Sequence, residues 1–113
     1  AYDIVNSDLS EPDIPQSGEI RHENYANNED LQWPVVTSCE AVELTSTVFE
    51  TEPTYDYVTI ENIRYTGSNG MTAGIIISTG NFIVYFHSDV SITNTGFVLN
   101  WACIGIVVLT FKV

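Results

Sequence analysis

The sequence predicts an all-β protein, an antiparallel β-sandwich. Three observations support this prediction. No window keeps the 3.6-residue periodicity of an amphipathic helix. Runs rich in β-branched and aromatic residues alternate between apolar and polar positions, as half-buried strands do. Turn-forming Gly, Asn, Asp and Ser recur between these runs at short spacing, a pattern typical of sandwiches.

The 113 residues suffice for one domain. Residues 1–17 are predicted to be an acidic N-terminal arm, because they combine four acidic side chains with two prolines. One short strand is expected within this arm, at Tyr2–Val5. Residues 18–113 are predicted to form the sandwich, with an extra strand at its C-terminal end. The first part of this region, residues 18–32, is polar and rich in turn-forming residues.

Alternating runs follow one another closely after Trp33 and Pro34. The longest covers residues 41–49, where we expect one face to carry Val42, Leu44, Ser46 and Val48. The other expected strands cover residues 35–37, 55–65, 73–78, 82–86, 97–101 and 104–111. The last of these is apolar and must be covered, either inside its own sandwich or by pairing with a neighbouring copy.

The charge of the chain restricts its partners. Three basic and fifteen acidic residues give a net charge of −12, which argues against binding to nucleic acid and to anionic membrane surfaces. It favours cationic partners, calcium or simple solubility. No apolar run reaches the roughly 18–20 residues that span a bilayer, so no membrane span is expected. Only one acidic residue, Asp89, lies beyond residue 61.

Two cysteines, Cys39 and Cys103, are separated by 64 positions. In a secreted chain we expect them to form a disulfide, which would contribute about 4 kcal/mol in the chain-entropy model. The alternative is a pair of buried free thiols. A zinc site is disfavoured because no histidines lie near them in the sequence. The opening residues, Ala-Tyr-Asp, are interpreted as an N-terminus exposed by processing.

Two aspartates lie at expected strand ends. Asp89 follows the alternating run "GNFIVYFHS", and a further strand restarts at Gly96 and Phe97. Asp56 lies at the start of the run "YDYVTI". If these loops meet, the two carboxylates form a site for a hard cation or a basic partner. The alternative is that each aspartate only caps a turn by accepting backbone amides.

Three stretches resemble the CUB domain, an extracellular β-sandwich module, and the resemblance implies a sandwich of jelly-roll type. The family's opening G-x-I-x-x-x-N-Y is similar to "GEIRHENY" at residues 18–25, and its Y-D-Y-V-x-I is matched by residues 55–60. Its late block, with V-x-F-x-S-D-x-S followed by G-F-x-L, is similar to residues 78–101. The usual two cysteine pairs of the family are absent, so the resemblance is to a divergent member with its own cross-link.

The resemblance implies a calcium ion at one end of the sandwich, held by Glu50, Asp56 and Asp89. Glu52 competes with Glu50 for this role, because the loop before Tyr55 is about two residues shorter than in the family. Calcium requires six to eight oxygen ligands, and loop carbonyls and water would complete the set. Without a cation, three converging carboxylates would repel one another and their pKa values would rise.

The expected function is that of a secreted, non-enzymatic recognition module. By resemblance, calcium-ordered loops would bind an extracellular protein through an exposed Lys or Arg of that partner. The expected partner-binding residues are Tyr55, Tyr57 and Ser91. Two alternatives remain: a structural subunit that self-associates into an oligomer or filament by strand addition, and carbohydrate binding. We expect no enzyme, because no spacing assembles a nucleophile with a base.

Overall fold

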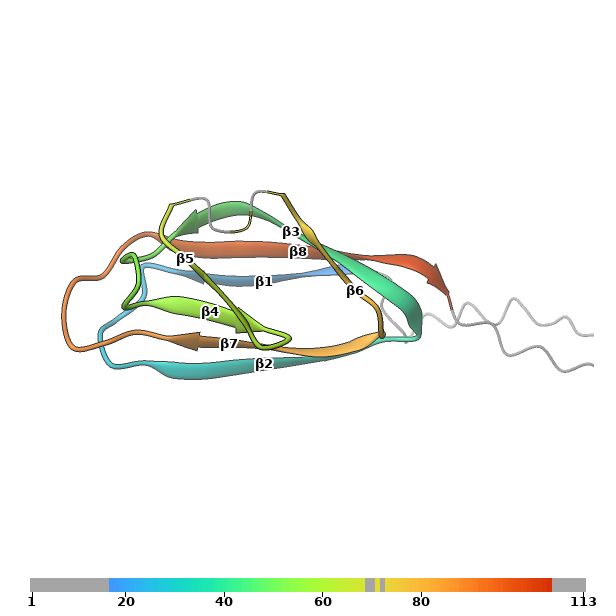
Figure 1. The fold of residues 1–113 in the computed structure, drawn as a ribbon, viewed down its shortest axis with the longest axis horizontal. Coiled ribbons are helices and arrows are strands. Elements are labelled where there is room, and N and C mark those ends of the chain that lie inside the picture. Colours follow the sequence, from blue (N-terminus) through green and yellow to red (C-terminus); the bar gives the residue numbers. More distant parts are fainter. Residues whose placement is uncertain (1–16, 69–70, 72, 107–113) are drawn as a thin grey trace, which may run out of the picture.

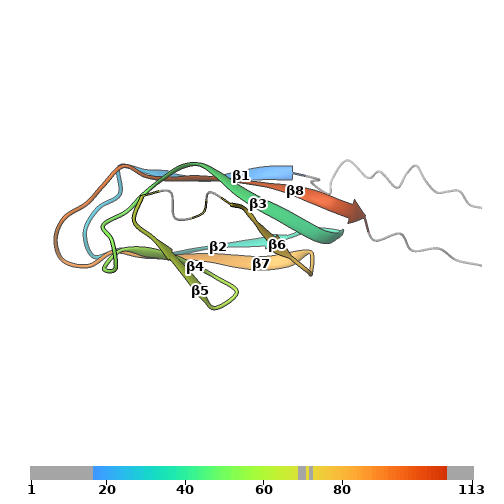
Figure 2. The same cartoon turned by 45° about the horizontal axis from the view of Figure 1, so that its top comes forward.

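The structure of the protein is a computed structural model that describes residues 17–68, 71 and 73–106. These residues form two antiparallel sheets packed face to face (Figures 1 and 2). The predicted β-sandwich is therefore confirmed. None of the described residues lies in a helix long and apolar enough to cross a membrane. Residues 1–16 of the acidic arm predicted at 1–17, with the strand expected at Tyr2–Val5, lie outside the described residues, as does the chain after residue 106.

Each sheet has four strands within the described part of the chain. The first sheet has the order β1-β8-β3-β6, with bounds Ser17–Glu23, Gly96–Ile106, Cys39–Glu50 and Ile75–Ile77. The second has the order β2-β7-β4-β5, with bounds Asp30–Val36, Asn81–His87, Tyr57–Ile60 and Ile63–Thr66. The first and last strands of the described chain, β1 and β8, are therefore hydrogen-bonded neighbours.

The core lies between the two sheets and follows the period of two in the sequence. In β7, Phe82, Val84 and Phe86 are buried, whereas the residues between them are exposed. Phe86 meets Phe97 of β8 across the sandwich, with ring centroids 5.3 Å apart. Trp101 is also a core residue, with 6% of its surface exposed.

A β-bulge interrupts the pairing of β3 with β8 between Ser46 and Val48. A bulge adds one residue to a strand and so reverses the alternation beyond it. Phe49 is consequently in the core and Val48 is not, which corrects the expectation that Val48 shares a face with Val42. Because successive side chains of a strand point to opposite faces, Glu50, the last residue of β3, lies on the opposite face from Phe49.

The first and last described strands, β1 and β8, differ from the sequence-based expectations. Strand β1 was not expected, because Ser17–Glu23 is mostly polar. Residues 104–106 do not start a new strand but continue β8, where Ile104 pairs with Ala41 and Ile106 with Cys39. The backbone of the described part of the apolar C-terminal run is therefore paired inside its own sheet, although the side chain of Ile104 is 41% exposed. The rest of the run lies outside the described residues.

The predicted disulfide between Cys39 and Cys103 is present. It joins β3 to β8 with a Cα–Cα distance of 5.3 Å, and the Cys39 side chain is buried. At the other end of β8, Gly96 has a φ of +100°, and a Cβ atom there would collide with the backbone of His22. Only glycine fits this close approach of β1 to β8.

Three loops meet at one end of the sandwich, on the left in Figure 1. They connect β1 to β2, β3 to β4, and β7 to β8. Because the strands are antiparallel, chain segments far apart in sequence finish at the same end. This arrangement brings the loops that carry Asp56 and Asp89 together.

Candidate functional site

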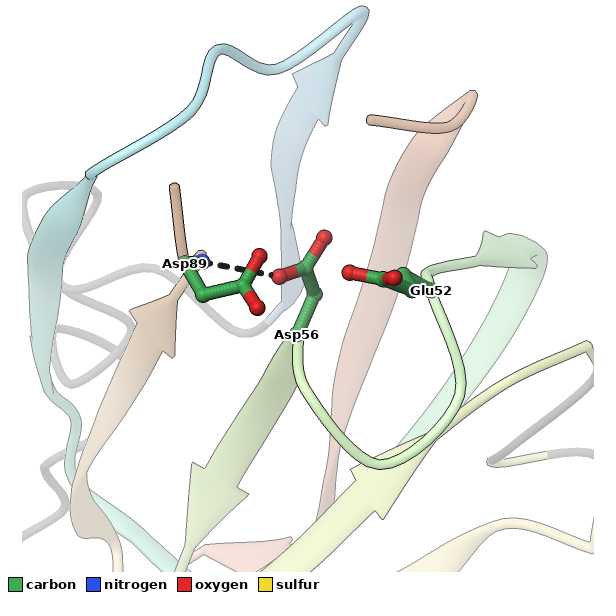
Figure 3. Close-up of side chains that lie close together, drawn as sticks. All are labelled: Glu52, Asp56 and Asp89. Atoms are coloured by element: carbon green, nitrogen blue, oxygen red, sulfur yellow. Dashed lines mark hydrogen bonds between the residues drawn. The ribbon is translucent and has the colours of Figure 1, made fainter. Parts of the chain in front are cut away.

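Three carboxylates converge at the loop end of the sandwich (Figure 3). Glu52 lies in the β3–β4 loop, Asp56 directly precedes β4, and Asp89 lies two residues after β7. One carboxylate oxygen of each residue lies within 4.8 Å of one from the others. Figure 3 shows Asp56 between the other two, with the three side chains turned toward one another.

Asp56 is the fixed centre of this group. Its side chain is fully buried, and both oxygens accept hydrogen bonds. Oδ2 accepts from the hydroxyl of Tyr25 at 2.6 Å, and Oδ1 accepts from the backbone N–H of Asp89 at 2.9 Å. Capping a backbone amide, the simpler role considered for Asp56, therefore coexists with its place among the carboxylates.

Tyr25 supports the site from the β1–β2 loop. Its ring is 4% exposed and packs edge-on against Phe86, with centroids 4.8 Å apart. Its hydroxyl donates to Asp56 and accepts the backbone N–H of Glu52 at 3.1 Å. Burial, and next the hydrogen bond to Asp56, raise the pKa of the phenol. The Tyr25 hydroxyl thus remains neutral and donates its proton to Asp56. Through its two hydrogen bonds it fixes Asp56 and Glu52 relative to each other.

Two threonines fix the loop between Glu52 and Asp56. Thr66 donates its hydroxyl to the carbonyl of Asp56 at 2.7 Å and accepts the N–H of Thr54 at 2.9 Å. Thr51 is buried and accepts the N–H of Gly67 at 2.9 Å. The N–H of Asp56 donates to the carbonyl of Glu52 at 3.0 Å, which closes one turn and brings both residues to the same place.

Ser88 fastens the β7–β8 loop to the β1–β2 loop. Its side chain is buried, donates to the carbonyl of Ala26 at 2.6 Å and accepts the N–H of Glu29 at 2.9 Å. The N–H of Asn28 donates to the carbonyl of Asp89 at 2.8 Å. The backbone of Asp89 is therefore held between two loops, independently of any ligand.

The electrostatics of the group are unfavourable without a cation. Oε1 of Glu52 is buried and has no hydrogen-bond partner in the described part of the protein. Desolvation, and next the charges of Asp89 and Asp56, raise the pKa of Glu52. A buried carboxylate oxygen without a partner is costly. Calcium, a hard cation that binds oxygen, would remove both penalties, so the residues present fit such an ion.

The structure brings Asp56 and Asp89 together as predicted, but it does not bring Glu50 to them. Glu50 pairs with Gly96 at the end of β3, and its Oε1 accepts the hydroxyl of Ser68 at 2.7 Å. The bulge in β3 turns Glu50 away from the core side of the strand. The third carboxylate is Glu52, the competing residue, which the turn to Asp56 positions.

The three expected partner-binding residues do not all lie at the same place in the structure. Tyr55 is 59% exposed and directly precedes Asp56. Ser91 is exposed, and its N–H donates to Oδ1 of Asp89 at 3.3 Å. Tyr57 instead lies on the outer face of the second sheet, with the guanidinium of Arg64 3.9 Å from its ring centroid. Tyr55 and Ser91 thus border the carboxylates, and binding of a partner by all three stays a prediction.

Sequence reasoning missed the residues that support the carboxylates, namely Tyr25, Thr51, Thr66 and Ser88. Tyr25 was visible as the last residue of the block "GEIRHENY", but its role was not. The threonines and the serine carry no signal of their own, because such hydroxyls are common in turns.

No protein-family model matches the chain, and no curated protein matches it. Solved structures do. The CUB1-EGF-CUB2 domain of human MASP-1/3 matches with a TM-score of 0.71 and 18% identity over 81% of this chain. The corresponding domains of rat MASP-1 match with a TM-score of 0.70 and 19% identity over 80% of it. The chain spans 43% and 41% of these two longer proteins.

A third structure is a single domain, the MASP-1 CUB2 domain bound to Ca²⁺. It matches with a TM-score of 0.69 and 19% identity, and the match covers 80% of this chain and 95% of that one. The expected resemblance therefore extends to the arrangement of the strands. The chain has the fold of a CUB domain.

Proposed function

We propose that this chain is a secreted, non-enzymatic recognition module that binds Ca²⁺ through Glu52, Asp56 and Asp89. The observation that carries this proposal is the buried Oε1 of Glu52, which lies beside two other carboxylates and has no hydrogen-bond partner among the described residues. The calcium ion in the MASP-1 CUB2 domain supports it. The disulfide is in keeping with an extracellular protein.

Calcium would supply positive charge where three negative groups meet. Glu52 and Asp56 come from the β3–β4 loop and Asp89 from the β7–β8 loop, so one ion would bind the two loops to each other. Tyr25 would keep Asp56 oriented, as outer-shell donors do at metal sites. Binding would stabilise the folded chain, because the unfolded chain does not hold these carboxylates together.

The proposed partner is an extracellular protein with an exposed Lys or Arg. The charge of −12 would steer a basic surface toward the protein. A carboxylate that also binds the ion would accept a charge-assisted hydrogen bond from the basic side chain. The role of the site is then to hold and orient a partner, and we propose no catalytic step.

The test is isothermal titration calorimetry with CaCl₂ on the protein and on two matched variants. Glu52→Gln should abolish the calcium heat, because it removes one of three carboxylate ligands. Glu50→Gln should leave it unchanged, because Glu50 bonds to Ser68 instead. Equal heats from both variants, or no heat from the unsubstituted protein at millimolar calcium, would refute the proposal.

A further inference from the structure

Three large apolar side chains are exposed at the loop end beside the carboxylates. Tyr55, Val90 and Ile92 are 59%, 71% and 62% exposed. Tyr55 directly precedes Asp56, and Val90 directly follows Asp89. In Figure 1 the β7–β8 loop, in orange, extends farthest from the sheets at this end. Single exposed apolar residues are ordinary, but these three lie on two loops that meet at the same end of the sandwich as the carboxylates.

Ile92 also has an unusual backbone conformation. Its φ is +68°, in the left-handed region that β-branched residues rarely adopt and that Asn or Gly suit better. Its side chain is mostly exposed, so burial within this chain does not offset the strain. Strained residues of this kind cluster at functional sites. We therefore expect the side chain of Ile92 to contact a molecule other than this chain.

The loop that carries Val90 and Ile92 is held at both ends. Asn28 donates to the carbonyl of Asp89 at 2.8 Å, and Asn24 donates to the carbonyl of Thr95 at 2.7 Å. A loop fixed in this way loses little conformational freedom on binding. Its apolar side chains are presented at a defined position relative to Asp89.

We propose that Tyr55, Val90 and Ile92 form an apolar rim that contacts aliphatic side chains flanking the basic residue of the partner. This inference rests on the proposed function, because the basic residue would bind at the neighbouring carboxylates. The partner segment would thus carry a Lys or Arg between aliphatic residues. Aliphatic contacts would add affinity and would distinguish this segment from other basic segments.

The negative charge of the chain favours a protein partner with an exposed Lys or Arg over an anionic lipid surface or a second copy of the chain. An anionic lipid surface would be repelled by a net charge of −12. A second copy of the chain offers few cations, because the sequence has three basic residues, of which Arg21 and Arg64 lie in the described part. Arg21 is paired with Glu19 and Glu23, and Arg64 lies over Tyr57.

The experiment uses two N-acetylated tripeptide amides, Leu-Lys-Leu and Ser-Lys-Ser, titrated into the ¹⁵N-labelled protein in saturating calcium. Chemical-shift changes give the Kd of each. We expect Leu-Lys-Leu to bind about tenfold more tightly, with shifts at residues 90–92. Ile92→Asn should remove most of this preference while calcium affinity stays the same. Ile76→Asn, at a residue equally exposed (60%) but on β6, is the control and should keep the preference.

Melting temperature separates a binding role from a structural one. Ile92→Asn should not lower it and should raise it by a few degrees, because Asn tolerates a positive φ and the lost side chain is exposed. A clearly lower melting temperature would mean that Ile92 stabilises the fold, and the inference would fail.

The remaining outcomes are distinguishable. Equal affinities for the two peptides, or no binding of either in the presence of bound calcium, would overturn the apolar rim while leaving calcium binding intact. Calcium-dependent sedimentation with phosphatidylcholine vesicles that requires Ile92, with no peptide preference, would assign the rim to lipid and overturn the proposal. If calcium does not bind but an Ile92-dependent leucine preference persists in EDTA, the rim is supported and the proposed function fails.

Discussion

Replacing Tyr25 by Phe tests whether the hydroxyl of this residue organises the site. Phe preserves the ring that packs against Phe86 but removes a donor to Asp56 and an acceptor for the N–H of Glu52. A hydrogen bond to a charged group contributes about 1.5–3 kcal/mol, and a buried N–H left without a partner costs about 1–3 kcal/mol. Since the two effects share one group, we expect a net loss of about 3 kcal/mol.

The assays are urea unfolding and thermal unfolding in EDTA, followed by a calcium titration. A loss of this size should lower the melting temperature by about 10 °C for a domain of this length. Calcium affinity should fall by about tenfold, as it does when outer-shell donors are removed. Tyr65→Phe is the matched control, because Tyr65 packs against the core but lies outside the site. Equal losses from the two variants would refute the role given to Tyr25.

Two further predictions concern pH and the disulfide. In the calcium-free protein the pKa of Glu52 is raised above its ordinary value of 4.5, so the folded state binds this proton more readily than the unfolded chain. Stability should therefore increase as the pH falls through the raised pKa toward 4.5, and the increase should be absent above it. Urea unfolding in EDTA at several pH values should show this contribution in the protein and not in Glu52→Gln; equal pH dependences would contradict it. Replacing both Cys39 and Cys103 by Ala should cost about 4 kcal/mol, because the bridge closes a loop across 64 positions. A loss under 1 kcal/mol in urea unfolding would mean that pairing with β8 already restrains β3.

The positions of Asp56 and Asp89 at strand ends could be predicted from the sequence, whereas the meeting of their loops was a condition that only the resemblance to the CUB domain implied. The strand expected at residues 82–86 likewise lies within β7. These features depend on local periodicity, which the sequence displays directly.

The choice between Glu50 and Glu52 could not be made in this way. It depends on the bulge after Ser46 and on the turn that bonds the N–H of Asp56 to the carbonyl of Glu52. Neither feature leaves a period or a motif in the sequence. The hydroxyl of Tyr25 was hidden for a similar reason, since its contact with Asp56 spans 31 positions and two strands, β2 and β3.

Strand β1 was missed because charge alternation conceals it. Glu19, Arg21 and Glu23 form salt bridges on its exposed face, while Ile20 is its buried apolar residue. A strand at the edge of a sheet gains protection against aggregation from such charges. The same residues make the segment resemble a polar loop.

The central claim is that Glu52, Asp56 and Asp89 hold one calcium ion between two loops. A crystal structure of the protein grown in calcium, with anomalous diffraction to identify the ion, tests it most directly. The account predicts an anomalous peak at about 2.3–2.6 Å from oxygens of all three side chains, with the hydroxyl of Tyr25 still bonded to Asp56. An ion bound at Glu50, or three carboxylates without an ion at millimolar calcium, would contradict it.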